Sequence, residues 1–195
     1  MNESLGPRAS RPHRGWHHRG YLPHFDSGAV VQMITFRLAD SLPRKIYREF
    51  LASSIRDPDR QSRIEAFVDE GRGACLLKQP RNASIAQAAL HHFDGERCRL
   101  LAWVIMPNHV HALLEQMDGH PLGDLVHSVK SFTAKQINRL EGSSGPVWAP
   151  DYHDRFVRND VHYANAVDYI ENNPVKAGLV RMPFEWIYSS ARERV

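Results

Sequence analysis

The sequence feature that most constrains the fold is a pair of apolar runs separated by three residues. Residues 100–105 and 109–115 are each long enough for a strand, and Met106-Pro107-Asn108 lies between them. Proline cannot donate to a sheet ladder and asparagine favours turns, so this pattern predicts a tight reversal between two antiparallel strands. We expect the resulting hairpin to extend over residues 98–116.

Two histidines follow the predicted turn, His109 and His111, with Val110 between them. Side chains alternate along a strand, so both imidazoles should point to one face and Val110 to the other. Two neutral imidazoles side by side can hold one divalent metal. The pattern is also compatible with two ordinary polar residues on a solvated strand face.

The elements around this hairpin predict a single α+β domain over residues 25–195. Further strands are expected at residues 30–38 and 152–158. Amphipathic or capped helical segments are expected at residues 45–55, 61–70, 82–93, 121–140 and 160–173. Strands and helices in this order favour an antiparallel sheet with helices on its faces, and a ferredoxin-like arrangement is our first choice.

The last predicted helix carries a second pair of chemical interest, Tyr169 and Asn173. They are four residues apart and therefore project from the same face. An amide oxygen is a ligand suited to Mg²⁺ or Mn²⁺, and a tyrosine can act as a covalent nucleophile. We expect Asp160 to cap this helix, and Pro174 should end it, because the residue before a proline avoids the helical region. Spacing alone does not bring this helix to the hairpin.

Composition excludes several classes of protein. A hydrophobic content of 42% and a charged content of 24% are typical of a soluble globular chain. No apolar run of eighteen or more residues is present, so no membrane span is expected. The N-terminal residues lack the apolar core of a signal peptide, which favours the cytoplasm. The two cysteines, Cys75 and Cys98, form no metal or disulfide motif.

The positive charge is concentrated in residues 1–24, which we interpret as a flexible basic arm. This segment holds four arginines against one glutamate and so accounts for the whole net charge of +3. Trp16, Tyr21 and several histidines are interleaved, a composition that suits single-stranded nucleic acid. A disordered tail that only keeps the protein soluble would have the same composition. The candidate contacts to nucleic acid are Arg11, Arg14 and Arg19 in the arm, with Lys130, Lys135 and Arg155 in the domain.

Two stretches resemble known motifs. Residues 106–111 (MPNHVH) resemble the His-hydrophobic-His signature of the HUH endonuclease superfamily, in the form used by single-tyrosine transposases. Residues 169–180 (YIENNPVKAGLV) are similar to the tyrosine-helix motif of the bacterial REP-associated tyrosine transposases. The resemblance extends from about residue 20 to about residue 190.

This resemblance implies an HUH endonuclease fold and a specific chemistry. His109 and His111 would be metal ligands, Asn173 the third ligand and Tyr169 the nucleophile, with Mg²⁺ or Mn²⁺ as the metal. In related insertion-sequence transposases the third ligand is commonly glutamine, so Asn173 departs from that pattern. The family cleaves and rejoins single-stranded hairpin DNA (repetitive extragenic palindromes) through a 5′-phosphotyrosine, as monomers or homodimers.

Alternatives of other classes remain open. The chain could be a domesticated hairpin-DNA-binding protein with weak or lost cleavage, although such a protein would not need the catalytic residues. A metal-dependent hydrolase of small substrates would not account for the basic aromatic arm. Among other tyrosines, Tyr163 lacks an amide four residues on. Glu115, on the same strand face as His111, is a further candidate ligand or supporting group.

Overall fold

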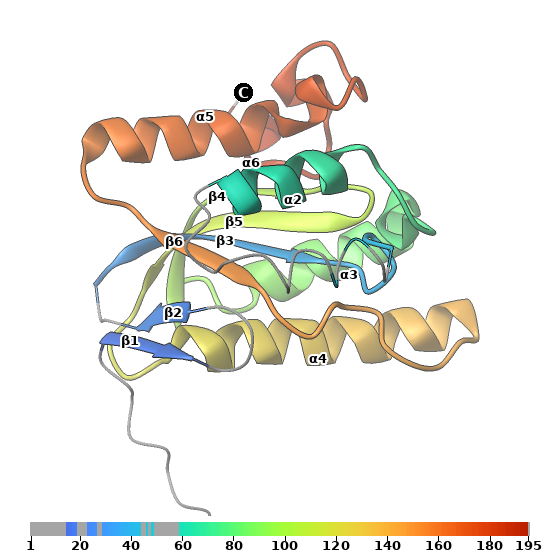
Figure 1. The fold of residues 1–195 in the computed structure, drawn as a ribbon, viewed down its shortest axis with the longest axis horizontal. Helices are drawn as coiled ribbons and strands as arrows, with labels where there is room; N and C mark the ends of the chain where they lie inside the picture. Colours follow the sequence, from blue (N-terminus) through green and yellow to red (C-terminus); the bar gives the residue numbers. More distant parts are fainter. Residues whose placement is uncertain are drawn as a thin grey trace, which may run out of the picture.

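The structure is a computed structural model that describes residues 15–18, 23–26, 29–43, 46, 48 and 59–194. A four-stranded sheet lies between two layers of helices, with α2 and α5 on one face and α3 and α4 on the other (Figure 1). The strands of this sheet are β3 (Val31–Arg37), β4 (Cys98–Ile105), β5 (His109–Gln116) and β6 (His153–Phe156). The helices are α2 (Asp59–Asp69), α3 (Pro80–His91), α4 (Leu122–Glu141) and α5 (Asp160–Lys176). Short helical turns complete the chain: η1 (Leu76–Lys78), η2 (Pro183–Glu185) and α6 (Ser190–Glu193).

The strand order is β4-β5-β3-β6, and every neighbouring pair is antiparallel. In chain order, with a helix after the first strand and another after the third, this is the ferredoxin-like arrangement. The predicted α+β fold with an antiparallel sheet is therefore confirmed.

The hairpin at the centre of the sheet turns at the predicted position. The backbone N–H of Met106 donates to the carbonyl of His109 at 2.8 Å, which closes a two-residue turn at Pro107 and Asn108. The carbonyl of Asn108 accepts from the N–H of Leu38 at 2.8 Å, so the turn is fixed to the end of β3. The two histidines therefore begin a strand that is paired on both edges.

Alternation along β5 divides its side chains between two layers. Val110, Ala112 and Leu114 belong to the main hydrophobic core, together with residues of α3 and α4. Leu113, on the opposite face, packs with Ala166 and Ile170 of α5. His109 and His111 share that second face, so α5 lies over the histidines.

Helix α5 differs from the prediction at both ends. Asn159, not Asp160, caps it, because its side-chain oxygen accepts from the backbone N–H of His162 at 2.8 Å. The helix also continues through Pro174 to Lys176, so the predicted end was wrong. A proline inside a helix removes one backbone hydrogen bond. Here only two helical residues follow, and the carbonyl of Pro174 accepts from the N–H of Leu179 at 2.9 Å in the turn that ends the helix.

The N-terminal segment is described only in part. Strands β1 (Gly15–His18) and β2 (Pro23–Asp26) form a separate antiparallel hairpin, and the predicted arm boundary at residue 24 falls within β2. The flexibility of the arm stays a prediction. Most of the predicted helix over residues 45–55 lies outside the described residues. No helix in the described part of the chain has the length and apolar character needed to cross a bilayer.

Candidate metal centre and nucleophile

Three elements bring polar side chains together on the α2 and α5 face of the sheet. Strand β5 supplies His109 and His111, and α5 supplies Asn173 and Tyr169. Helix α2 adds Asp69, a residue that the sequence interpretation missed. The two predicted pairs, which are far apart in the chain, therefore meet in one place.

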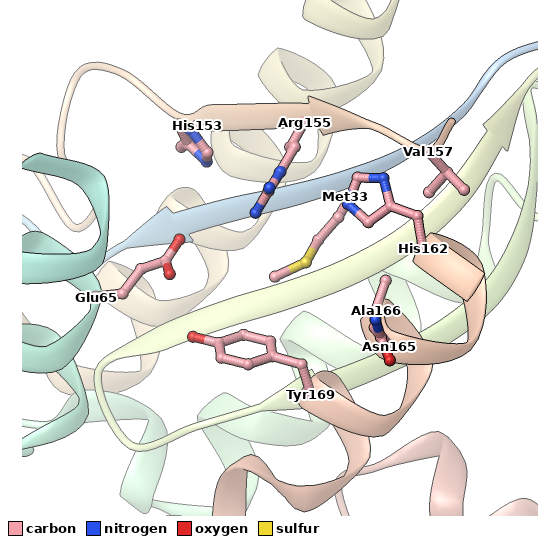
Figure 2. A pocket seen from close by; sticks show the side chains of 9 residues that line it. All are labelled: Met33, Glu65, His153, Arg155, Val157, His162, Asn165, Ala166 and Tyr169. Atoms are coloured by element: carbon pink, nitrogen blue, oxygen red, sulfur yellow. The ribbon is translucent and has the colours of Figure 1, made fainter. Parts of the chain in front are cut away.

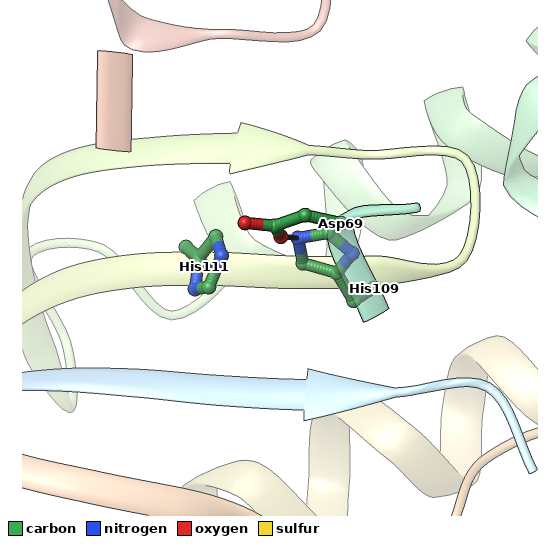
Figure 3. Close-up of side chains that lie close together, drawn as sticks. All are labelled: Asp69, His109 and His111. Atoms are coloured by element: carbon green, nitrogen blue, oxygen red, sulfur yellow. Dashed lines mark ion pairs between the residues drawn. The ribbon is translucent and has the colours of Figure 1, made fainter. Parts of the chain in front are cut away.

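The two imidazoles and the Asp69 carboxylate form a compact set of ligand atoms. One nitrogen from each histidine and one Asp69 oxygen all lie within 4.8 Å of one another. His109 Nε2 lies 3.4 Å from Asp69 Oδ1, and the three side chains face one another in Figure 3. Imidazole nitrogen and carboxylate oxygen are common ligands of first-row divalent metals.

The orientation of His109 is fixed by its neighbour in the turn. Asn108 donates through Nδ2 to the carbonyls of Val68 at 2.9 Å and Arg72 at 3.0 Å, so its Oδ1 must act as an acceptor. That oxygen lies 2.8 Å from His109 Nδ1, which therefore carries the ring proton. The lone pair of His109 is then on Nε2, which faces Asp69. Such outer hydrogen bonds are typical of histidines that bind metals.

His111 is oriented in a similar way by the adjacent strand. Thr35 of β3 is paired directly with His111, and its Oγ1 lies 2.8 Å from His111 Nδ1. The amide nitrogen of Asn173 lies 3.5 Å from Nε2 of the same ring. Because that amide nitrogen can only donate, Nδ1 carries the ring proton and Nε2 keeps its lone pair. Both histidines thus direct an unprotonated Nε2 into the same space.

The burial of the site decides its protonation states. Burial lowers the pKa of His109 to about 3 and that of His111 well below its ordinary value, so both rings are neutral at pH 7. Burial, with the nearby charge of Glu65, raises the pKa of Asp69 to about 6. Neutral imidazoles beside a carboxylate that still ionises near neutral pH are the forms that bind a cation.

The unsatisfied atoms of the site give an independent test of whether a cation would fit. Within the described part of the chain, His109 Nε2, Asp69 Oδ1 and Asn173 Oδ1 are buried and have no hydrogen-bond partner. All three are acceptors, and buried acceptors without a donor are costly. A hard divalent cation would satisfy His109 Nε2 and Asp69 Oδ1 together, so the residues present fit such an ion. The amide nitrogen of Asn173 faces His111, so ligation through Oδ1 would require a half-turn of that amide.

Tyr169 lies beside the candidate metal ligands. Its ring packs edge-on against His111, with ring centroids 5.3 Å apart, and Lys176 Nζ lies 4.7 Å from its ring centroid. Its hydroxyl points toward the carboxylate of Glu65 on α2 (Figure 2). Burial, followed by the negative charges of Glu65 and Asp69, raises the pKa of Tyr169 above its ordinary value. The phenol is therefore protonated unless a partner takes its proton.

The predicted nucleic-acid contacts have different environments. Lys130 Nζ donates to the carbonyls of Ala149 and Pro150 at 2.8 and 3.0 Å, so it holds the loop before β6. Burial lowers its pKa to about 8. Lys135 is exposed on α4, and Arg155 is exposed on β6 close to Tyr169. Arg11, Arg14 and Arg19 lie outside the described residues. A role toward DNA stays a prediction for all six.

Two other sequence candidates lie apart from the site. Glu115 forms an ion pair with Arg99, and it faces Val31 rather than the histidines across the β3–β5 ladder. Tyr163 packs among the apolar residues under α5. Neither belongs to the compact group of ligand atoms.

Two acidic residues of α2 near the site could have been predicted from the sequence. Glu65 and Asp69 are four residues apart on a predicted helix, as Tyr169 and Asn173 are on theirs. The same spacing argument would have placed both carboxylates on one helical face. Their positions beside the histidines (Asp69) and Tyr169 (Glu65), however, depend on how α2 packs on the sheet.

Comparisons with known proteins show the family of the chain. The family described as "Transposase IS200 like" matches residues 67–173, a range that includes Asp69, both histidines, Tyr169 and Asn173. A REP-associated tyrosine transposase of Escherichia coli (strain K12) is 33% identical over 89 residues, which cover 46% of this chain and 52% of that protein. The chain thus spans about half the length of this curated relative.

A solved structure gives the fold comparison. The structure of a REP-associated tyrosine transposase bound to a REP hairpin superposes with a TM-score of 0.56 and 21% sequence identity. The match covers 91% of this chain and 82% of that chain. At this identity the likeness concerns the fold, and it confirms the fold class expected from the sequence.

Proposed function

The chain belongs to the IS200-like transposase family, and on this premise we propose that it cleaves and rejoins single-stranded, hairpin-forming DNA through Tyr169. The observation that carries the proposal is the meeting of Tyr169 with a buried set of unsatisfied ligand atoms. Attack of the Tyr169 hydroxyl oxygen on a phosphodiester would form a bond to phosphorus as the bond to the 3′ oxygen breaks. The products are a 5′-phosphotyrosine and a free 3′ end, and the reverse reaction rejoins the strand.

The residues on β5, α2 and α5 would hold the metal. His109 and His111 would supply Nε2, with Asp69 and Asn173 supplying oxygen, a set suited to Mg²⁺ or Mn²⁺. A divalent cation held by these residues would polarise a phosphate oxygen and offset the charge that develops on it. Asn108 and Thr35 already hold the two imidazoles in a ligating orientation, so only the amide of Asn173 would have to turn.

The proton of the nucleophile also needs an acceptor. Glu65 is the carboxylate toward which the Tyr169 hydroxyl points, and it lies one helical turn from Asp69 (Figure 2). In the proposed cleavage Glu65 takes the phenolic proton as the tyrosyl oxygen bonds to phosphorus, and the departing 3′ oxygen takes a proton from water. In the rejoining step the 3′ hydroxyl loses its proton to solvent as its oxygen bonds to phosphorus, and the departing Tyr169 oxygen takes its proton back from Glu65.

Covalent capture of DNA tests this proposal directly. A hairpin oligonucleotide with single-stranded flanks is labelled at its 3′ end, because the fragment on the 3′ side of the cut keeps the 5′ phosphate that Tyr169 would hold. With Mg²⁺ or Mn²⁺, the wild-type protein should give a labelled band that survives denaturing electrophoresis. Tyr169→Phe should bind the hairpin as well as wild type and give no adduct, since it lacks the attacking oxygen.

Two controls separate chemistry from folding. Tyr163→Phe, the same change six residues earlier on the same helix, should leave adduct formation unchanged. His109→Ala combined with His111→Ala should lower adduct formation steeply while keeping the tyrosine hydroxyl. An adduct that persists in Tyr169→Phe would assign the nucleophile to another residue. A wild-type protein that binds hairpins but never cleaves in any divalent metal would be a hairpin-binding protein instead.

The basic arm is proposed to add affinity for single-stranded DNA. Replacing Arg11, Arg14 and Arg19 by alanine should weaken hairpin binding. The slope of log affinity against log salt should also become shallower by about 0.7 for each phosphate that the variant no longer neutralises. Fluorescence anisotropy at several salt concentrations measures both quantities. An unchanged slope would limit the arm to a role in solubility.

A further inference from the structure

A cavity of about 210 Å³ opens beside Tyr169, and apart from Tyr169 and Glu65 its lining residues have no role in the proposed chemistry. Its walls come from β3, β6, α2 and α5, and the ring of Tyr169 forms part of its lining (Figure 2). A water molecule in the liquid takes up about 30 Å³, so the cavity has room for a flat ring system and not only for solvent.

One side of the cavity is apolar. Met33 of β3, Val157 after β6 and Ala166 of α5 line it, and all three pack in the layer beneath α5. An apolar surface next to an aromatic ring is suited to the face of a nucleobase, since every base has such a face regardless of sequence. The hydrophobic layer that secures α5 to the sheet therefore also offers a surface on which a base can rest.

Two basic side chains, Arg155 and His162, also line the cavity. The guanidinium of Arg155 lines the cavity, and no described carboxylate pairs with it. His162 accepts a hydrogen bond from the backbone N–H of Arg158 at its Nδ1, 3.3 Å away, so its Nε2 is free to act as a donor. An unpaired arginine with a neighbouring donor is suited to the oxygens of a backbone phosphate. Glu65, at the Tyr169 end, would not favour a phosphate there.

From this arrangement we propose that the cavity is a subsite for one nucleotide of the single strand, with its base against Met33, Val157 and Ala166 and its phosphate against Arg155. Because Tyr169 lines the cavity, this nucleotide is the one adjacent to the phosphate under attack. The inference rests on the proposed function for the identity of the ligand. The subsite would place the scissile phosphate, so that one unpaired nucleotide contributes more to binding than its neighbours.

The experiment is an abasic scan of binding, done in EDTA so that no cleavage occurs. Each position of the single-stranded flanks of the hairpin is replaced in turn by an abasic nucleotide, and affinity for the full chain is measured by fluorescence anisotropy. At one flank position, loss of the base should weaken binding about tenfold, a typical effect for a base that stacks on protein.

Filling the cavity should abolish that sensitivity. Asn165 is exposed and lines the cavity, so Asn165→Phe occupies the space without disturbing the core. This variant should bind the intact oligonucleotide about tenfold more weakly, and the abasic change at the sensitive position should then cost nothing further. Ala164→Phe is the matched control, because Ala164 is exposed on the same helix but does not line the cavity. It should behave like wild type at every position.

The role of Arg155 is tested by salt dependence. Arg155→Ala should reduce the single-strand salt slope by about 0.7, the value for one phosphate contact. Arg158→Ala, an exposed arginine that does not line the cavity, should not change the slope. If Asn165→Phe and the abasic changes are additive at every position, or Arg155→Ala leaves the slope unchanged, the subsite is wrong. Because these measurements involve no cleavage, a protein that fails to form the Tyr169 adduct would still give a clear result here.

Discussion

The two faces of the central strand differ in chemistry but not in burial. Val110 and Leu114, on the face toward α3 and α4, are 0% and 1% exposed, and His109 and His111, on the face toward α5, are each 1% exposed. The apolar pair packs in the main core, whereas the histidines are bonded to Asn108 and Thr35 through Nδ1. One strand therefore contributes to the main core on one side and to the candidate metal site on the other.

The comparison shows where stability and function are separated in this fold. The apolar face gains hydrophobic free energy with no polar group to satisfy. The polar face keeps several acceptors unsatisfied, each at a cost of about 1–3 kcal/mol. We infer that the apolar face stabilises the domain. The cost of the unsatisfied acceptors on the polar face would be offset when a cation and DNA bind there.

The largest expected effect comes from the apolar face. Leu114→Ala removes a fully buried side chain from the main core and should lower the free energy of unfolding by about 2–5 kcal/mol. Metal affinity of the folded fraction should stay the same, because Leu114 points away from the histidines. Urea unfolding and Mn²⁺ titration measure the two quantities. Leu140→Ala, at a half-exposed position on α4, is the control for a leucine outside the core. A large loss of metal affinity in Leu114→Ala would mean that the faces are not independent.

The next effect concerns Asp69 on the polar face. Asp69→Asn keeps the shape of the side chain but removes its charge, and Mn²⁺ affinity should fall by about 100-fold or more, beyond the usual range for supporting residues alone. Isothermal titration calorimetry would measure it. An unchanged affinity would exclude Asp69 as a ligand and leave the two histidines with Asn173.

The same variant predicts a dependence of stability on pH. The pKa of Asp69 is raised from 3.8 to about 6 in the folded protein, so between these values the unfolded chain has already lost the proton that the folded protein still holds. The contribution of Asp69 to the free energy of unfolding of the metal-free protein is therefore lost as pH rises through about 6. Asp69→Asn should lack this loss, and the stability of the variant relative to wild type should rise between pH 4 and pH 7, as measured in EDTA. A constant difference would mean that the Asp69 carboxyl is not buried as described.

The smallest expected effects come from the same Thr→Val change, made once on each face. Thr35→Val removes the hydroxyl bonded to His111 and should weaken Mn²⁺ binding about 10- to 100-fold with little change in stability. Thr133→Val removes the acceptor of the Trp148 indole N–H, 2.8 Å away in the apolar core. It should lower the free energy of unfolding by about 1–3 kcal/mol and leave metal affinity unchanged. If both variants bound Mn²⁺ equally weakly, the contrast between the faces would be wrong.

The sequence by itself determined the local geometry. Strand alternation placed His109 and His111 on one face, and the spacing of Tyr169 and Asn173 placed them on one side of a helix. The turn at Pro107 could also be predicted, because proline has no backbone N–H to donate to a neighbouring strand and is therefore disfavoured inside a sheet. The prediction that Pro174 ends helix α5 was wrong. The cost of a proline depends on how much helix follows it, and here only two residues do.

Only the tertiary structure decided which residues meet. Asp69 reaches the histidines and Glu65 reaches Tyr169 because α2 packs on the same face of the sheet as α5, and no local pattern specifies that face. Lys130 was predicted to contact phosphate, but in the structure its ammonium donates to three backbone carbonyls. Periodicity fixes where a side chain points relative to its own helix or strand. Which residues the side chain then meets depends on how elements that are distant in the chain pack together. The free energy gained by burying apolar surface between those elements is a property of the whole fold.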